Sequence, residues 1–93
     1  MKAILNDRVI AESDDIVENG GYHYFPADAT HVEWMHKAPK TESDHACPHG
    51  VQFYDVVIDG ERAARAAWIY EKPQPKMQEV DGRVAFWHEV KVG

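Results

Sequence analysis

The fold is decided by residues 62–70, which read Arg62-Ala63-Ala64-Arg65-Ala66-Ala67-Trp68-Ile69-Tyr70. Because side chains alternate along a β-strand, this stretch, taken as a strand, puts Trp68 and Tyr70 on one face and Ile69 on the other. The alanines before these rings leave room for something bulky opposite. Core side chains from neighbouring strands or a bound ligand would fill that room, and the stretch itself favours neither.

The same stretch forms the second arm of a predicted hairpin. Residues 51–58 are apolar and β-branched, as is typical of a strand, and Asp59-Gly60 is the clearest hairpin turn in the chain. We therefore expect residues 62–70 to return antiparallel to residues 51–58.

Further turn signals at residues 6, 19 and 81 separate other short strand-like runs. The strands are expected at residues 2–5, 8–11, 16–18, 22–25 and 83–92. In the last of these, Phe86 and Trp87 are expected to point to opposite faces. The first two runs flank Asn6-Asp7 and indicate an opening hairpin.

Helix signals are weak and local. Residues 26–30 suit one helical turn, since Pro26 is tolerated at its first position. Residues 31–36 favour a strand, with a longer helix over 27–36 as the alternative. Residues 37–50 form a connection without periodicity, and connections of this length are often functional. Residues 72–80 are expected to be loop with one helical turn.

The fold class that these signals predict is mainly β. We expect one small domain over residues 1–93, built from antiparallel strands and hairpins in a bent or two-layer sheet, with at most one or two short helical turns. Helix-rich and parallel α/β folds are excluded because the chain has no amphipathic stretch of ten or more residues.

Charge and cysteine content limit the classes of partner and the cellular location that we expect. Sixteen Asp and Glu against ten Lys and Arg give a net charge of -6, with the basic residues scattered. Such a surface repels nucleic acid and anionic membranes, so we expect neither as a partner. A single cysteine, Cys47, forms no intramolecular disulfide, and no apolar run suits a signal peptide or a membrane span. We therefore expect a cytoplasmic protein.

Five motifs follow one another along nearly the whole chain: Tyr24-Phe25-Pro26, Cys47-Pro48 with Gly50, Tyr54, Ala67-Trp68-Ile69-Tyr70 with Pro73, and Val84-Ala85-Phe86-Trp87. Together they resemble the bacterial domain of unknown function family 427. The resemblance implies a fold similar to the β-tent group, which also contains the methionine sulfoxide reductase B enzymes and several small zinc-binding domains.

The resemblance carries no catalytic residue to this chain. Relatives in the wider group hold zinc with two pairs of cysteines, which one cysteine does not supply. The family pattern Cys-Pro-any-Lys-Gly is one residue shorter here, and His49 is the residue left to replace its lysine. The family is sometimes labelled as nucleotidyltransferase-type, but this sequence has neither suitably paired carboxylates nor a glycine-rich phosphate loop.

The densest group of chemically active residues lies in residues 43–50. His45, Cys47 and His49 are two residues apart, so an extended loop would project all three to one side. Imidazole and thiolate bind zinc or copper, with His31 or His36 as a fourth ligand. Because the spacing matches no standard zinc signature, we favour a polar loop and expect no metal and no cofactor.

The same residues allow an enzymatic interpretation. Cys47 activated by His45 or His49 would act as the nucleophile of a small hydrolase or transferase. The sequence shows no orienting Asp or Asn and no oxyanion motif, so a structural cysteine is the favoured alternative.

Aromatic residues give the leading hypothesis, a small-molecule-binding module. Tyr and Trp combine an apolar body with a polar edge and suit a flat or cationic ligand. We predict a pocket beside the Cys47 loop formed by Tyr24, Tyr54, Trp68, Tyr70 and Trp87. The alternatives are that these rings are the core of a small domain, or that the chain is a structural or protein-interaction domain. The oligomeric state stays open.

Overall fold

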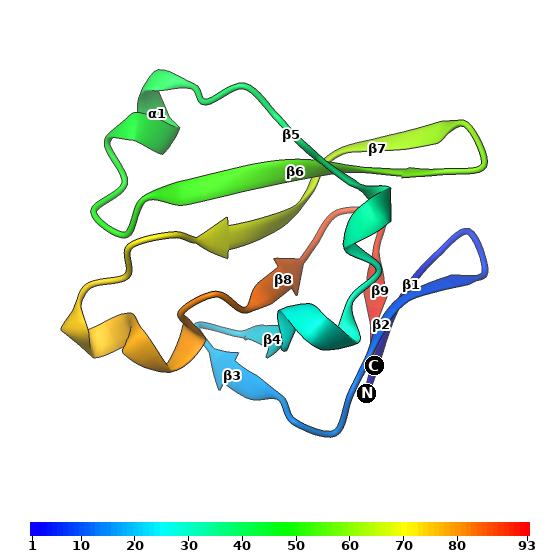
Figure 1. Ribbon diagram of the computed structural model, residues 1–93, viewed down its shortest axis with the longest axis horizontal. Helices are drawn as coiled ribbons and strands as arrows, with labels where there is room; N and C mark the ends of the chain where they lie inside the picture. Colours follow the sequence, from blue (N-terminus) through cyan, green and yellow to red (C-terminus); the bar gives the residue numbers. More distant parts are fainter.

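Two antiparallel sheets make up the fold in the computed structural model, which describes residues 1–93 (Figure 1). The smaller sheet has the strand order β2-β1-β9 and the larger has the order β3-β4-β8-β7-β6-β5. The strands are β1 (Lys2–Leu5), β2 (Arg8–Glu12), β3 (Val17–Asn19), β4 (Tyr22–Phe25), β5 (Met35–Lys37), β6 (Val51–Ile58), β7 (Glu61–Tyr70), β8 (Val84–Phe86) and β9 (Lys91–Val92). The predicted mainly-β class is confirmed.

Four short helical segments join the strands, namely η1 (Ala27–Ala29), η2 (Val32–Trp34), α1 (Glu42–His45) and η3 (Pro75–Val80). The helical turn predicted after Pro26 is confirmed as η1. The strand predicted over residues 31–36 is wrong in its first part, because η2 occupies Val32–Trp34 and β5 begins only at Met35. No residue of η2 is fully buried, and Trp34 is its one residue that packs against the first cluster, so an alternating apolar face is not required there. None of the helices has the length and hydrophobicity needed to cross a membrane.

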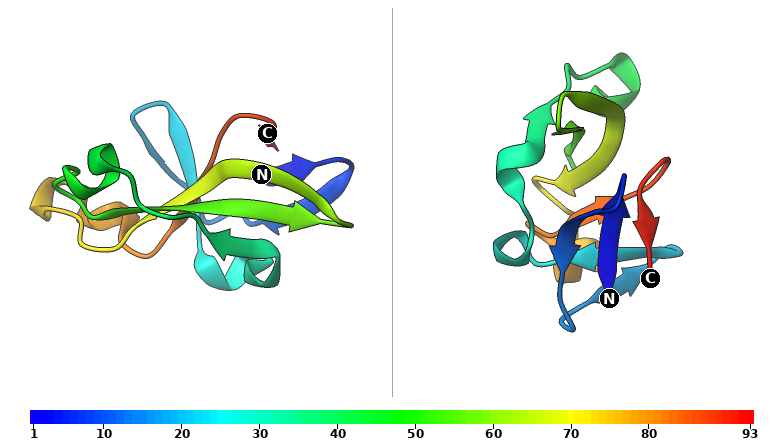
Figure 2. Two further views of the ribbon diagram at one scale, coloured as in Figure 1. Left: turned by 90° about the horizontal axis from the view of Figure 1, so that it is seen from above. Right: turned by 90° about the vertical axis from the view of Figure 1, so that its right-hand side faces the viewer.

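The longest hairpin is β6 and β7, which curves along the molecule in Figure 2. Its turn at Asp59-Gly60 has positive φ at both residues, which suits Gly and is tolerated by Asp. The antiparallel pairing predicted for this hairpin is confirmed. The ladder is interrupted by a bulge, however, because Tyr54 pairs with Ala67 whereas Val56 pairs with Ala63. One residue of β6 therefore faces three of β7, among them Arg65 with a φ of 53°.

Two hydrophobic clusters lie on opposite faces of the larger sheet. The first cluster has 13 buried residues, including Phe25, Val56 and Phe86 together with residues of β1 and β2. The second cluster is centred on five buried residues, Tyr24, Val51, Trp68, Val80 and Ala85. Ile69 packs against the first cluster, whereas Tyr70 and Trp87 pack against the second. The predicted alternation of Trp68, Ile69 and Tyr70, and of Phe86 and Trp87, is confirmed.

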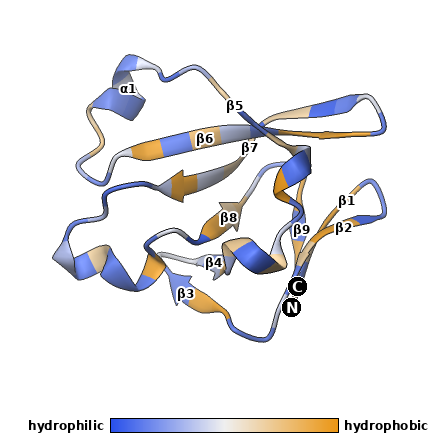
Figure 3. Ribbon diagram, in the orientation of Figure 1, coloured by the Kyte–Doolittle hydropathy of each residue, from blue (hydrophilic) through white to orange (hydrophobic).

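The closing segment differs from its prediction. Residues 83–92 are not one strand but two, because β8 pairs with β7 in the larger sheet and β9 pairs with β1 in the smaller one. The chain turns between them, with His88 at a φ of 56° and the Val90 N–H donating to the Trp87 carbonyl. Figure 3 shows the resulting distribution of hydropathy, with hydrophobic stretches on β1 and β2 and hydrophilic hairpin turns.

Candidate functional site

A hydrophobic pocket of about 170 Å³ opens on the face of the larger sheet that carries the second cluster. We call it the aromatic pocket, and define it by its six lining residues, Tyr22, Val51, Phe53, Trp68, Tyr70 and Trp87. They come from β4, β6, β7 and the residue that follows β8. No charged side chain is among them.

Strand register brings these residues together. Val51 lies directly opposite Tyr70, and Phe53 lies directly opposite Trp68, so all four share one face of the hairpin. On the other side of β7, Ala85 of β8 pairs with both Trp68 and Tyr24. Because alanine is small, the two rings reach across it and meet edge to face, with centroids 6.2 Å apart.

Trp68 is the centre of the ring packing. Its ring centroid lies 4.9 Å from that of Tyr22 and 5.1 Å from that of Trp87, with angles of 87° and 67° between the ring planes, so both contacts are edge to face. Phe53 stacks on Trp87 with centroids 5.5 Å apart and an angle of 19° between their planes. Edge-to-face and offset-stacked pairs are the favoured arrangements for aromatic rings, so these side chains hold one another in place.

The indole N–H of Trp68 has no hydrogen-bond partner, although the side chain is only 4% exposed. The nearby hydroxyl groups belong to Tyr24 and Tyr70. Burial raises the pKa of Tyr24 to about 12, and the neighbouring Tyr70 adds to this rise while the Trp68 indole opposes it. The Trp68 indole N–H therefore lies beside the Tyr24 hydroxyl, on a residue that does not line the aromatic pocket.

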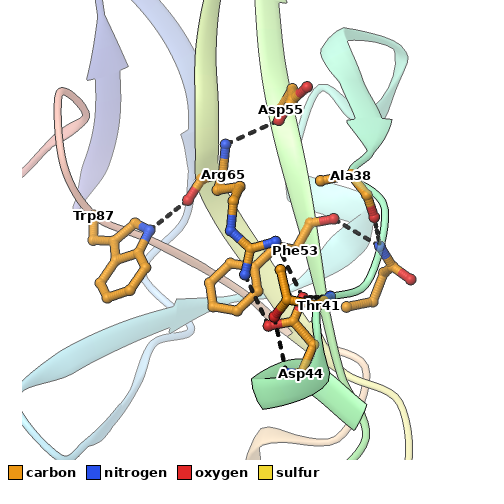
Figure 4. A network of polar contacts seen from close by, with 8 residues as sticks. Ala38, Thr41, Asp44, Phe53, Asp55, Arg65 and Trp87 are labelled. Carbon is orange, nitrogen blue, oxygen red and sulfur yellow. Dashed lines mark hydrogen bonds and ion pairs between the residues drawn. The ribbon is translucent and has the colours of Figure 1, made fainter.

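One wall of the aromatic pocket is supported by an ion pair (Figure 4). The guanidinium of Arg65 lies 4.1 Å from the centroid of the Phe53 ring. It also donates two hydrogen bonds to Asp44, of 2.8 and 3.1 Å. These bonds from Arg65 hold the pKa of Asp44 down at about 2, despite the burial of its carboxyl group. Arg65 therefore reaches from β7 to α1 across the back of Phe53.

The backbone of Arg65 supports the pocket as well. Its N–H donates to Oδ1 of Asp55 at 2.9 Å, and its carbonyl accepts a hydrogen bond from Nε1 of Trp87. The Arg65 N–H is the main reason why the pKa of Asp55 lies below its usual value. The bulge thus fixes Trp87, whose indole N–H is satisfied, in contrast to that of Trp68.

The structure brings three of the five predicted ligand-binding residues to the aromatic pocket, namely Trp68, Tyr70 and Trp87. Tyr24 does not line it, but packs behind Trp68 and is 2% exposed. Tyr54 lies on the opposite face of β6, where it packs against the first cluster. Alternation along the strand separates it from its neighbour Phe53.

The prediction did not include Tyr22, Val51 or Phe53, which also line the aromatic pocket. Two signals would have found them. Val51 and Phe53 fall on the same face as Trp68 in a hairpin closed by Asp59-Gly60. Tyr22 stands two residues before Tyr24, so it shares a face of β4 with that residue.

The candidate metal ligands His45, Cys47 and His49, which the sequence analysis disfavoured as a site, do not converge. The segment is not extended, because α1 ends at His45 and a turn follows through Cys47. No group of three or more His, Cys, Asp and Glu side chains in the chain is placed to share a metal ion. His45 is exposed, and His49 accepts a hydrogen bond at Nδ1 from the Gln74 backbone N–H at 2.9 Å.

Cys47 is half-buried and packs against the second cluster, on the same side of the molecule as Trp68. No hydrogen bond joins Cys47 to His45 or to His49 among the side-chain hydrogen bonds of the protein, so the arrangement shows no base paired with this thiol. The loop borders the aromatic pocket through His49, whose ring lies 5.4 Å from that of Tyr70.

Comparison with known proteins agrees with the five motifs that run along the sequence. A family model described as a domain of unknown function (DUF427) matches residues 1–93. No curated protein matches the chain. The chain, a small β domain with a cluster of aromatic rings on one face of its larger sheet, therefore belongs to the DUF427 family.

Proposed function

We propose that this domain is a small-molecule-binding module whose site is the aromatic pocket. One observation carries the proposal. Six hydrophobic side chains, five of them aromatic, line an open pocket of about 170 Å³ on one face of the larger sheet, and no charged side chain is among them.

An open apolar pocket does not benefit the stability of the empty protein, because its rings stay in contact with water. A bound molecule that covers these rings removes apolar surface from water, which is favourable. A mainly hydrophobic and aromatic lining is typical of small-molecule sites.

The rings are already ordered by contacts outside the pocket. Trp87 is held by the carbonyl of Arg65, and Phe53 lies between the Arg65 guanidinium and the Trp87 ring. Such preorganisation reduces the conformational entropy lost on binding. In this proposal the Cys47 loop forms the edge of the pocket near Tyr70 and takes part in no reaction.

Charge supports a small molecule as the partner. The net charge of -6 disfavours nucleic acid and anionic membranes. The single cysteine, which forms no intramolecular disulfide, supports a cytoplasmic location.

A screen of one-ring compounds against the full chain tests the proposal. Compounds that raise the melting temperature are retested against protein whose tryptophans carry ¹⁵N in the indole. A ligand in the aromatic pocket shifts the indole signals of Trp68 and Trp87 and leaves that of Trp34, which stacks on His31, unchanged. Hits that shift only Trp34, or a screen in which no compound moves the other two signals, would contradict it.

A further inference from the structure

We infer that Tyr22 is the specificity-determining residue of the aromatic pocket, and that its ring limits the ligand to a group about the size of one six-membered ring. This inference rests on the proposed function and adds the residue that selects among ligands by size. Three observations support it: the exposure of Tyr22, the contacts of its ring and its position on the hairpin of β3 and β4.

Exposure distinguishes Tyr22 from the other residues that line the pocket. Tyr22 is 38% exposed, whereas Val51 and Trp68 are only 6% and 4% exposed. The other three lining residues are half-buried. Buried residues therefore form the base of the pocket, and Tyr22 lies at its opening, where an entering ligand contacts it.

The ring of Tyr22 contacts two other rings of the pocket edge to face. Its centroid lies 4.9 Å from that of Trp68 and 6.3 Å from that of Trp87, with angles of 87° and 78° between the ring planes. Phe53 and Trp87 are held from outside the pocket by Arg65, whereas both aromatic contacts of Tyr22 are with rings that line it. The Tyr22 ring can therefore be removed without loss of the Arg65 contacts that support the other walls.

Backbone pairing places Tyr22 at the periphery of the larger sheet. It is the first residue of β4 and pairs with Asn19 of β3, which is an edge strand. Only the last two residues of β4 pair with β8, so Tyr22 lies beyond that ladder. The turn Gly20-Gly21 has positive φ at both residues and open space around each, and an exposed hydrogen bond of 3.1 Å from Asn19 to Glu79 joins it to η3. Substitution of Tyr22 is therefore expected to leave the fold intact.

With the Tyr22 ring in place, the volume of the pocket suits one ring. An apolar protein cavity of about 150 Å³ accommodates benzene, and the aromatic pocket has about 170 Å³. A second fused ring on the ligand must either extend into solvent or take the place of the Tyr22 ring. The first leaves apolar surface in water, and the second breaks the contacts of Tyr22 with Trp68 and Trp87. Neither gains affinity, so we expect a two-ring ligand to bind no more tightly than a one-ring ligand.

Two probes that differ by one fused ring test the inference: benzyl alcohol and 2-naphthylmethanol. Each is titrated into the full chain with ¹⁵N-labelled tryptophan indoles, assigned with single Trp→Phe variants, and affinity is measured from the signals of Trp68 and Trp87. In the unmodified protein we expect 2-naphthylmethanol to bind no more tightly than benzyl alcohol. Tyr22→Ala opens the side that the ring closes, so the second ring can lie against Trp68 and Trp87. In this variant we expect 2-naphthylmethanol to bind about ten-fold more tightly than benzyl alcohol.

Three further variants complete the test. Tyr22→Phe retains the ring and loses only the hydroxyl, so it is expected to retain the preference of the unmodified protein. Val32→Ala removes an apolar side chain that is 52% exposed and lies outside the pocket, and is expected to leave the preference unchanged. Tyr22→Val introduces a β-branched residue that suits a strand, and we expect the ratio of the two affinities to shift in the same direction as in Tyr22→Ala. If Tyr22→Ala does not fold, Tyr22→Val decides the question.

The outcomes distinguish this inference from the proposed function. The inference is overturned, and a binding pocket remains, if the ratio of the two affinities is unchanged in Tyr22→Ala and Tyr22→Val. The same conclusion follows if Tyr22→Phe changes the ratio as much as Tyr22→Ala, or if 2-naphthylmethanol already binds the unmodified protein ten-fold more tightly. If neither probe moves the indole signals of Trp68 and Trp87 in any of these proteins, both the inference and the proposed function fail.

Discussion

The indole N–H of Trp87 donates to the main-chain carbonyl of Arg65, and this bond joins the residue after β8 to the bulge of β7. The donor belongs to a ring of the aromatic pocket, and the acceptor belongs to a residue with a φ of 53°. The position of Trp87 in the aromatic pocket and the conformation of the β7 bulge therefore depend on each other.

Removing this donor tests that dependence. Trp87→Phe retains a ring but leaves the Arg65 carbonyl without its partner, so we expect the free energy of unfolding to fall by about 1–2 kcal/mol. Urea denaturation followed by circular dichroism measures the change. Trp34→Phe is the control, because no hydrogen bond of the Trp34 indole is seen. An equal loss in the two variants would contradict the role given to the bond.

Breaking the ion pair between α1 and β7 is a second test. Asp44→Asn removes the charge that faces Arg65, and Asp44 is only 4% exposed. We expect a loss of about 2 kcal/mol, since the guanidinium, which is partly exposed, is left without a counter-charge. Asp59→Asn serves as control, because the Arg8–Asp59 pair is exposed and is expected to contribute less than about 0.5 kcal/mol. Similar losses in both variants would show that burial does not strengthen the Asp44 pair.

The pKa of Asp44 predicts how stability depends on pH. Its folded-state value of about 2 lies below the ordinary 3.8, so the folded protein favours the carboxylate. The stabilisation is complete above the unfolded pKa and is lost as pH falls from 3.8 towards 2. We expect the difference in unfolding free energy between the unmodified protein and Asp44→Asn to shrink over this range. Asp55, whose pKa is also lowered, is present in both proteins and cancels. A constant difference from pH 5 to pH 2 would contradict the assignment.

Asp55 provides a test of the bulge itself. Asp55→Ala removes the acceptor for the Arg65 N–H, whereas Asp55→Asn keeps an oxygen there and loses the charge and the acceptor oxygen that face the exposed Arg62 side chain. We expect the alanine variant to lose about 1–2 kcal/mol and the asparagine variant less than about 1 kcal/mol. Hydrogen exchange of the Arg65 amide is expected to accelerate only in the alanine variant. If it accelerates equally in both, the carboxylate charge rather than the hydrogen bond holds the bulge.

Substitution of Cys47 is expected to leave ligand affinity nearly unchanged. It packs on the second cluster without lining the aromatic pocket, so Cys47→Ala is expected to change the affinity for a one-ring compound found in the screen by less than about two-fold. The same titration by indole signals measures this. A loss of ten-fold or more would assign the thiol a direct part in binding.

The long hairpin was predictable because its signals are local. Asp59-Gly60 identifies the turn, and alternation then separates Trp68 from Ile69. The same register already places Phe53 on the face of Trp68, so parity alone was sufficient to prefer Phe53 over Tyr54. Tyr54 has the polar edge expected of a ligand-binding ring, but alternation places it on the opposite face, against the first cluster.

The bulge was not predictable from local signals. An undisturbed ladder from the turn would pair Trp68 with Val51, whereas the bulge moves it opposite Phe53. Positive φ favours Gly, Asn or Asp, and Arg65 is none of these. Its conformation is fixed by Asp44, Asp55 and Trp87, which lie 21, 10 and 22 residues away in the chain.

The helix α1 was predictable in part. Thr41 and Asp44 form a capping box, in which each side chain accepts from the backbone of the other, and the Thr-x-x-Asp spacing was visible in the sequence. Recognising it would have excluded an extended loop from 43 to 50. Without an extended loop, His45, Cys47 and His49 do not all project to one side, so their alternate spacing no longer predicts a metal site.

The small side chain of Ala85 affects the size of the aromatic pocket as well as the packing of the sheet. It is fully buried on β8 between Tyr24 and Trp68, and its methyl group sets how closely those two rings approach. Replacing Ala85 with a larger residue would push Trp68 towards the opening of the aromatic pocket and reduce the volume available to a ligand. If the pocket binds a ligand as proposed, the size of that ligand is expected to depend on Ala85, a buried residue that does not line the pocket.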